Sequence, residues 1–187
     1  MSRSSHVKLM SAYNSWMNRK LYQAAAALPA DELARDRGAF FGSLLGTLNH
    51  LVAGDTVWLK RFAAEAATSP ALSPAAFAAL APVRALAMPA SLDAPLFDAL
   101  GPMAAHREWL DGAITAWAEA LTEADLGATL RYARMNGDGH AKPLFDVLLH
   151  FFNHQTHHRG QASTLLSQAG VDVGVTDLLA LIPDLAP

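Results

Sequence analysis

The amino-acid sequence contains no cysteine in its 187 residues. This absence excludes disulfide bonds, thiolate nucleophiles and cysteine-ligated zinc sites, so a metal site in this chain must use histidine, aspartate or glutamate. Positive charge is also scarce, because 14 lysine and arginine residues stand against 17 acidic residues and give a formal net charge of −3. The basic residues are scattered along the chain, so the sequence gives no support to a nucleic-acid-binding face.

Long hydrophobic runs are absent as well. No segment of 18 or more residues is free of polar and charged groups, so we expect no membrane-spanning helix. The N-terminal residues lack the apolar stretch and cleavage site of a secretion signal, and the default expectation is a cytoplasmic protein. Hydrophobic residues nevertheless make up 52% of the chain, which favours a compact core and a single domain over residues 1–187.

Four long segments have apolar residues spaced by three and four positions, which is typical of amphipathic helices. The spacing predicts helices over residues 7–28, 44–66, 96–121 and 143–169. The first of these ends before Pro29, and Ser43 is expected to cap the second. Pro143 is expected to be the first residue of the fourth helix, and Gly170 to follow its end.

The connections between these helices differ in length. Prolines recur between the second and third helices and leave room only for short helical pieces such as residues 74–80, so residues 68–94 are expected to form a long crossover. These prolines are Pro70, Pro74, Pro82, Pro89 and Pro95. Residues 129–142 break the helical pattern and contain the turn signal Asn136-Gly137-Asp138-Gly139, which is compatible with a hairpin or with an irregular loop.

Four amphipathic helices with one long crossover between the second and the third predict an all-α fold, a four-helix bundle. A further short helix over residues 176–181 is expected in the tail. The interior of such a bundle is where side chains from facing helices can build a metal site.

Half of the eight histidines lie in one segment, His150-Phe-Phe-Asn-His154-Gln-Thr-His157-His158. His154 and His158 are four residues apart, so both lie on one face of a helix and can reach one ion. His157 lies near the same face, so the spacing alone allows two choices of pair. A third ligand must come from elsewhere. His50 is the best candidate, because it lies in another apolar segment where an unpaired imidazole is costly to bury.

Several other polar residues are weaker candidates. Gln161 lies on the ligand face, where it can orient a ligand or a bound substrate or be an ordinary helix-face amide. Asp55 follows His50 by five residues and is a poor partner for it, and Gln155 stands where a zinc protease would have glutamate, which disfavours that mechanism. We expect His150 to lie near the site in an outer position, and Arg159 to form a salt bridge. Tyr132 and Arg134 are candidates for the mouth of the site. No metal role is expected for His6, His106 and His140.

The pair Asn49-His50 and the segment Asn153-His154-Gln-Thr-His157-His158-Arg159-Gly160-Gln161 together resemble the signature of the DinB/YfiT-like superfamily, which is distinct from the DNA polymerase that shares its name. The resemblance covers nearly the whole chain in element order. It implies a four-helix bundle in an unusual connection order that is often dimeric. It also implies that the metal ligands are His50, His154 and His158, which selects His158 over His157.

The resemblance implies a zinc or nickel site more firmly than it implies a reaction. Characterised relatives include thiol-dependent S-transferases and a mycothiol-dependent maleylpyruvate isomerase. The expected activity is therefore that of a metal-dependent enzyme acting on a small molecule by thiol transfer, isomerisation or hydrolysis, with or without a low-molecular-weight thiol. The alternative is a non-catalytic bundle in which the ion stabilises the fold or senses metal or stress. The sequence offers no obvious fourth ligand, which favours the enzyme.

The four tryptophans bear on the state of association. A single four-helix core can bury only some of Trp16, Trp58, Trp109 and Trp117, and a helix that is apolar on more than one side is commonly covered by a second subunit. We therefore expect a homodimer with its contact on the first and third long helices.

Overall fold

The structure is a computed structural model that describes residues 2–68 and 72–184, so Pro70 of the expected crossover lies outside the described residues. The chain is mostly helical, as predicted, with one small sheet. In chain order the elements are α1 (Arg3–Ala25), α2 (Ala30–Ala34), α3 (Leu44–Thr68), α4 (Pro74–Ala79), η1 (Ala81–Ala85), α5 (Leu100–Ala120), η2 (Asp125–Gly127), β1 (Thr129–Ala133), β2 (Gly139–Pro143), α6 (Leu144–Gln168) and η3 (Leu178–Leu181).

The ends of the long helices follow from local side chains that satisfy free backbone groups. The Ser2 side chain accepts a hydrogen bond from the backbone N–H of Ser5, so α1 begins earlier than predicted. Ser43 Oγ accepts from the backbone N–H of Gly46 at 3.0 Å, which confirms the predicted cap of α3. Gly170 follows α6 with a φ of 80°, a left-handed conformation that glycine adopts without strain.

The first helix also ends earlier than predicted, at Ala25 rather than at residue 28. Two further predicted helix starts are wrong. Pro143 is the last residue of β2, and α6 begins at Leu144. The third long helix, α5, begins at Leu100 rather than at residue 96, because the backbone of Phe97 is held elsewhere. Its N–H donates to Asn49 Oδ1 and its C=O accepts from Asn49 Nδ2, both at 2.9 Å. Residues 96–99 therefore belong to the connection and not to the helix.

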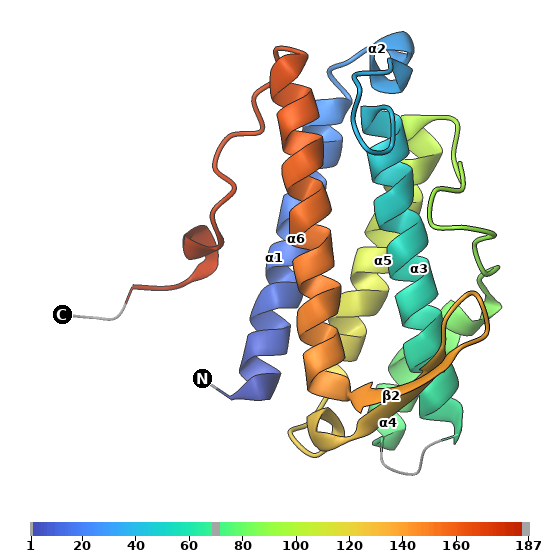
Figure 1. Cartoon of the computed structure of the whole chain (residues 1–187). Coiled ribbons are helices and arrows are strands. Elements are labelled where there is room, and N and C mark those ends of the chain that lie inside the picture. Colours follow the sequence, from blue (N-terminus) through green and yellow to red (C-terminus); the bar gives the residue numbers. More distant parts are fainter. Residues whose placement is uncertain (1, 69–71, 185–187) are drawn as a thin grey trace.

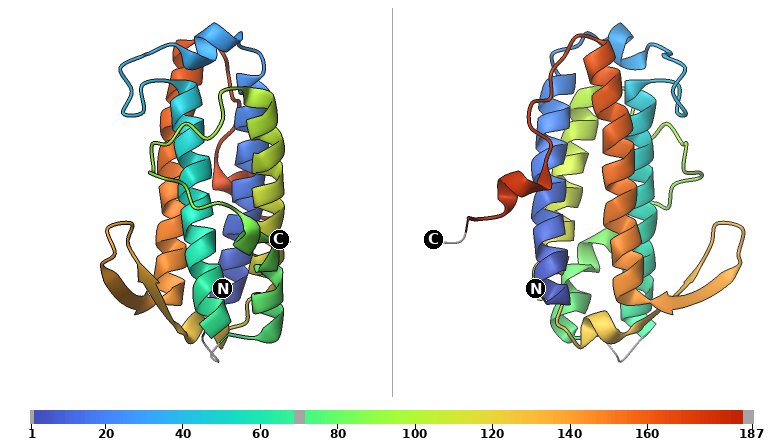
Figure 2. Two further views of the ribbon diagram at one scale, coloured as in Figure 1. Left: turned by 90° about the vertical axis from the view of Figure 1, so that its right-hand side faces the viewer. Right: turned by 60° about the vertical axis from the view of Figure 1, so that its left-hand side comes forward.

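The four long helices α1, α3, α5 and α6 lie side by side (Figure 1, Figure 2). α1 packs against α5 and α6, and α3 packs against the same two helices. Figure 1 shows that α3 and α5 run in the same direction, so the chain between them returns along the full length of the helices. This connection passes the outer side of α3, where the backbone oxygen of Leu92 contacts His50.

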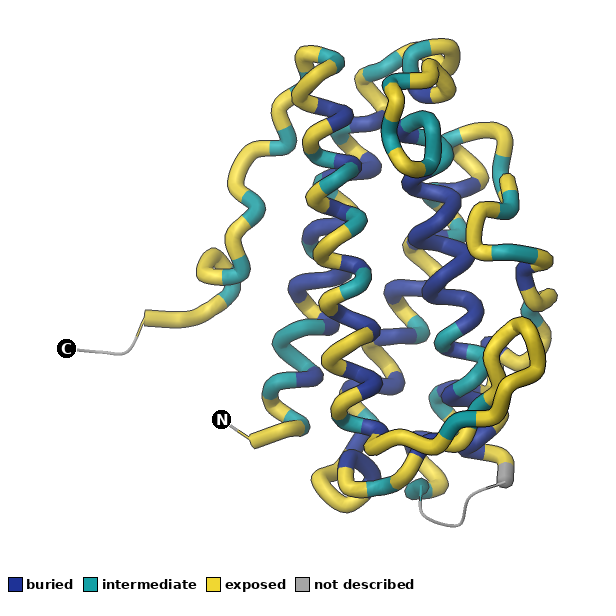
Figure 3. Tube along the Cα trace, in the orientation of Figure 1, coloured by how far each residue is buried: buried dark blue, intermediate teal, exposed yellow. Residues whose placement is uncertain are grey.

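The core lies between the inner faces of these helices, where buried residues line the tube in Figure 3. Phe62 of α3 has its ring centroid 4.6 Å from Trp117 of α5 and 5.8 Å from Phe151 of α6. All three side chains are almost fully buried. Burial of each large apolar side chain contributes about 1.5–3 kcal/mol, so this contact fixes α3 against α6.

The segment that the sequence left open between α5 and α6 is a hairpin. β1 and β2 pair in antiparallel register with Tyr132 opposite His140, and the turn includes Gly137 with a φ of 91°. Figure 2 shows the hairpin projecting from the side of the helices. Within residues 2–68 and 72–184, no helix has the length and apolar character needed to cross a membrane.

Candidate metal centre

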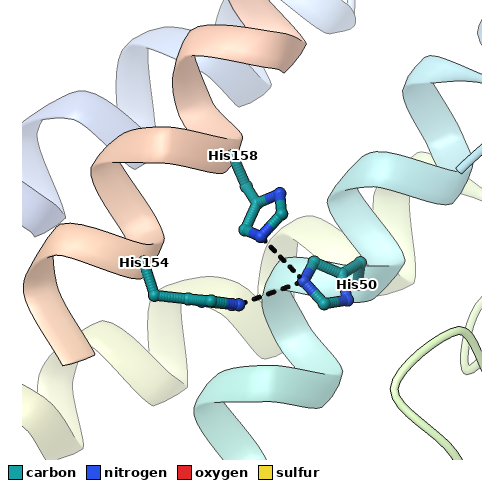
Figure 4. A group of neighbouring side chains, drawn as sticks. All are labelled: His50, His154 and His158. Atoms are coloured by element: carbon teal, nitrogen blue, oxygen red, sulfur yellow. Dashed lines mark hydrogen bonds between the residues drawn. The ribbon is translucent and has the colours of Figure 1, made fainter. Parts of the chain in front are cut away.

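Three histidine side chains from two helices point toward one another (Figure 4). His50 comes from α3, and His154 and His158 come from successive turns of α6. His50 Nε2 lies 3.2 Å from His154 Nε2 and 3.1 Å from His158 Nε2. Within the described part of the chain this is the one group of three or more potential ligands close enough to share an ion.

The spacing of the three Nε2 atoms fits a divalent ion. Imidazole nitrogens lie about 2.0–2.1 Å from zinc, so tetrahedral ligands are about 3.3 Å apart, close to the two distances from His50. No fourth histidine or carboxylate among the described residues belongs to the group. The three histidines can therefore hold a divalent ion and leave a coordination position for another molecule.

The other ring nitrogens hold two of the imidazoles in place. His50 Nδ1 lies 2.8 Å from the backbone oxygen of Leu92, and His158 Nδ1 lies 2.7 Å from Gln161 Oε1. Because both partners are acceptors, each Nδ1 carries the proton and each Nε2 presents a lone pair to the centre. Such outer hydrogen bonds are typical of histidine ligands, since they fix both the tautomer and the orientation of the ring.

The charge state of the three rings also suits metal binding. Burial, together with the charges of His158 and His50, lowers the pKa of His154 to about 3. Burial is likewise the largest cause that lowers the pKa of His50 and of His158. The rings are therefore neutral at neutral pH, which is the form that binds a metal ion.

A glycine makes room for one of these rings. Gly54 lies on α3 one turn after His50, and a Cβ placed there would lie 3.1 Å from His154 Cε1. A glycine inside a helix costs roughly 0.5–1 kcal/mol relative to alanine. The close approach of α6 to α3 at this point explains why the sequence has glycine here.

The connection before α5 and the loop before α3 complete the walls. Asn49 ties the backbone of Phe97 to α3, and this attachment holds the same connection that places the Leu92 oxygen against His50. Phe41 stacks on the His50 ring with centroids 3.9 Å apart. In the sequence, Asn49 stood out only as the residue beside His50 in a motif. Leu92 contacts His50 through its backbone oxygen, and nothing in the sequence signals that contact.

The sequence model of the DinB family matches residues 1–184. The chain belongs to the DinB family. No curated protein and no solved structure gives a significant match. The DinB assignment covers both helices that carry the histidines, and it names no substrate.

The other candidate residues of this DinB protein lie apart from the three Nε2 atoms. His157 is exposed and contributes no atom to the group. Asp55 is buried and accepts hydrogen bonds from Arg107 and Gln155. The expected salt bridge of Arg159 is wrong, because among the described residues no carboxylate pairs with it; its guanidinium donates to Asn14 and Thr156.

Three further candidates lie beside the DinB histidines. His150 has its ring 6.0 Å from that of His154 and 5.4 Å from that of Trp58. It lines a pocket of about 480 Å³ together with His154 and Arg134, and Tyr132 lines the adjoining pocket. His150, Tyr132 and Arg134 therefore line the space beside the three histidines. His6, His106 and His140 lie outside the three-histidine group.

Proposed function

We propose that the protein is a metal-dependent enzyme that acts on a small molecule by thiol transfer, isomerisation or hydrolysis. The ligands are His50, His154 and His158, and the ion is zinc or nickel. The observation that carries the proposal is the convergence of three neutral imidazoles without a fourth protein ligand among the described residues, beside a pocket lined by His154. A closed fourth ligand is typical of structural metal sites, and an open position of catalytic ones.

A dication at this centre would make a bound water or thiol acidic enough to act as a nucleophile at neutral pH. The protein's own contribution is to hold the ligands and shape the space around them. Leu92 O and Gln161 Oε1 fix the ring orientations of two ligands, and Phe41 covers one face of His50. A low-molecular-weight thiol is a further cofactor that this chemistry accommodates.

The first experiment measures metal content of the purified protein and of three single variants, His50→Ala, His154→Ala and His158→Ala. We expect about one ion per chain in the wild type, as a single three-ligand site dictates, and a sharp loss in each variant. His157→Ala is the matched control, because His157 neighbours a ligand and contributes no atom to the group. Retention of a full complement of metal by the triple variant would overturn the ligand assignment.

The second experiment tests the reaction. The metal-loaded protein is screened with low-molecular-weight thiols and a general electrophile such as 1-chloro-2,4-dinitrobenzene, and with ester substrates, in the presence and absence of a chelator. Turnover that chelation abolishes and the His154→Ala variant lacks supports the enzyme. Stoichiometric metal that raises the melting temperature without any turnover supports instead the non-catalytic alternative, in which the ion only stabilises the fold by binding the native state.

We also propose that the four long helices and their crossover form the family's bundle as one domain, and that two chains associate through α1 and α5. Support for the dimer comes from Trp109 on α5, which is 40% exposed. Trp117 is buried in the core, and Trp16 and Trp58 are half-buried, so Trp109 is the one tryptophan left to support a dimer. Sedimentation at micromolar concentration tests it: a species twice the 19.9 kDa chain mass is expected.

A further inference from the structure

A pocket extends away from the three-histidine centre between α3, α6 and the β1–β2 hairpin. Its inner part, about 480 Å³, is lined by Gly54 and His154, and its outer part, about 470 Å³, is lined by Tyr132 and Lys142. The two parts share Trp58, Arg61, Arg134 and His150, so they adjoin. Each volume falls in the range of small-molecule sites. We call this space the hairpin pocket.

Aromatic rings form one wall of the hairpin pocket. Trp58 of α3 contacts Tyr132 of β1 edge-on, with centroids 5.3 Å apart, and contacts His150 of α6 in the same way at 5.4 Å. The three rings come from three different elements: Trp58 and His150 line both parts of the pocket, and Tyr132 lines the outer part. A wall of this kind binds a flat or apolar body.

Cationic side chains also line the hairpin pocket. The guanidinium of Arg61 lies 4.7 Å from the Trp58 ring centroid and 5.2 Å from that of Tyr132, so it is held in place by aromatic faces. Arg134 lines both parts of the pocket and Lys142 the outer part. Among the described residues, neither Arg61 nor Arg134 forms an ion pair.

The charge of the pocket is not balanced by its own lining. The inner part has two arginines and no acidic residue, and the outer part has Asp146 alone against the two arginines and Lys142. Elsewhere in the described part of the fold, some arginines have carboxylate partners and others, such as Arg159, do not. Arg131, on the same strand as Tyr132, lies 3.5 Å from Glu65. Two guanidinium groups without carboxylate partners on one pocket wall are therefore suited to bind an anion from outside the chain.

We propose that the hairpin pocket binds a small carboxylate with an aromatic or flat apolar body. The carboxylate contacts Arg61 and Arg134, the body lies against Trp58, and the other end of the molecule extends toward the three-histidine centre. The planar guanidinium matches a planar carboxylate through paired hydrogen bonds. The inference deepens the proposed function, because it names the substrate class of that same centre, and it rests on the centre being reactive.

The test uses benzoate and its neutral isostere benzamide as probes. Each is titrated into the isotopically labelled full-length protein, zinc-loaded or chelated, while NMR follows the indole N–H of Trp58. Charge-assisted hydrogen bonds contribute about 1.5–3 kcal/mol, so benzoate is expected to bind about tenfold more tightly than benzamide or better. Arg61→Gln should bring the two affinities to within about twofold, and Arg61→Lys should keep part of the preference.

Controls separate the pocket from the fold and from the metal. Arg134→Gln is a second variant in an exposed position, so it tests the same claim should Arg61→Gln fail to fold. Arg131→Gln removes the same charge from the same hairpin outside the pocket lining, and the preference for benzoate should survive it.

The outcomes distinguish this inference from the proposed function. A preference for benzoate that needs Arg61 or Arg134 and persists after chelation upholds the hairpin pocket, even should the protein hold no metal. Equal affinity for benzoate and benzamide in the metal-loaded wild type overturns the pocket and leaves the metal centre standing. The hairpin pocket is also overturned if Arg61→Gln and Arg134→Gln both keep the preference for benzoate and chelation abolishes it. The carboxylate would then bind the ion and not the arginines.

Discussion

Two polar clusters lie between the same helices and differ in how their atoms are paired. In the first, the three-histidine centre, the Nε2 atoms face one another, and no further histidine or carboxylate within the described residues joins them. The second, which we call the charged core network, consists of buried side chains that bind one another. Its members are Asn14, Asn18, Asp55, Arg107, Asp111, Gln155 and Arg159.

The pairing in the charged core network is dense. Asp55 accepts hydrogen bonds from Arg107 and from Gln155, the latter at 2.7 Å. Asp111 lies 2.9 Å from Arg107 and accepts from Asn14 at 3.0 Å. These contacts join all four long helices. Buried polar side chains that bind one another hold the helices together, even though Arg107 Nε, Gln155 Oε1 and Arg159 Nε have no hydrogen-bond partner among the described residues. A cluster whose lone pairs converge on a shared space is instead suited to bind an ion.

The largest expected effect breaks the charged core network. Asp55→Ala leaves the buried guanidinium of Arg107 without one of its two carboxylates, and loss of one partner of a buried pair costs about 3–5 kcal/mol. Urea unfolding of the metal-free protein should show this drop in the free energy of unfolding. Glu108→Ala, an exposed neighbour on α5, is the control and should change it by less than about 0.5 kcal/mol. An Asp55→Ala protein with wild-type stability would show that the charged core network does not hold the helices together.

A smaller effect is expected at the edge of the three-histidine centre. Gln161→Ala removes the acceptor of the His158 Nδ1 proton, and loss of such an outer partner typically weakens metal affinity about 10–100-fold. Gln161→Glu keeps an acceptor there and should largely preserve the affinity. Competition with a chromogenic chelator measures both. A fall in turnover at saturating metal with unchanged affinity would show instead that Gln161 acts on the substrate.

The pH dependence of stability follows from the histidine centre. Folding lowers the pKa of His154 from 6.5 to about 3, so between these values the unfolded chain binds more protons than the folded one. Stability of the metal-free protein is therefore fully present above about pH 6.5 and is lost as the pH falls, with a slope of at most about 1.4 kcal/mol per pH unit per proton. Urea unfolding at several pH values tests the sign. His154→Ala should flatten the slope. A slope equal to that of the wild type would show that His154 does not cause the pH dependence of stability.

The smallest effect concerns a glycine. Gly54→Ala places a Cβ 3.1 Å from His154 Cε1, so the ring must shift by a few tenths of an ångström. Metal affinity should fall, although the better helix propensity of alanine contributes up to about 1 kcal/mol to stability. Gly112→Ala on α5 meets nothing within 4 Å and should gain that stability with metal affinity unchanged. Identical metal affinity in the two variants would show that Gly54 makes no room for the ligand.

The sequence predicted the four long helices because their apolar spacing and their capping residues, such as Ser43 and Gly170, are local signals. It missed the start of α5, since residues 96–99 are held by Asn49, a partner 48 residues away. The resemblance singled out the three histidines that the fold brings together. The Leu92 oxygen, the Phe41 ring and the space left by Gly54 depend on tertiary packing, and the pattern of residues carries no information about them.

The most direct test of the central claim is X-ray absorption on the zinc-loaded wild-type protein, together with its metal stoichiometry. We expect one zinc per chain, bound by three imidazoles and one further light atom at about 2.0–2.1 Å. The further atom should be exchangeable, so an added small thiol should replace it with sulfur at about 2.3 Å. A protein that releases zinc on dialysis, or a spectrum that fits fewer than three imidazoles, would contradict the three-histidine centre.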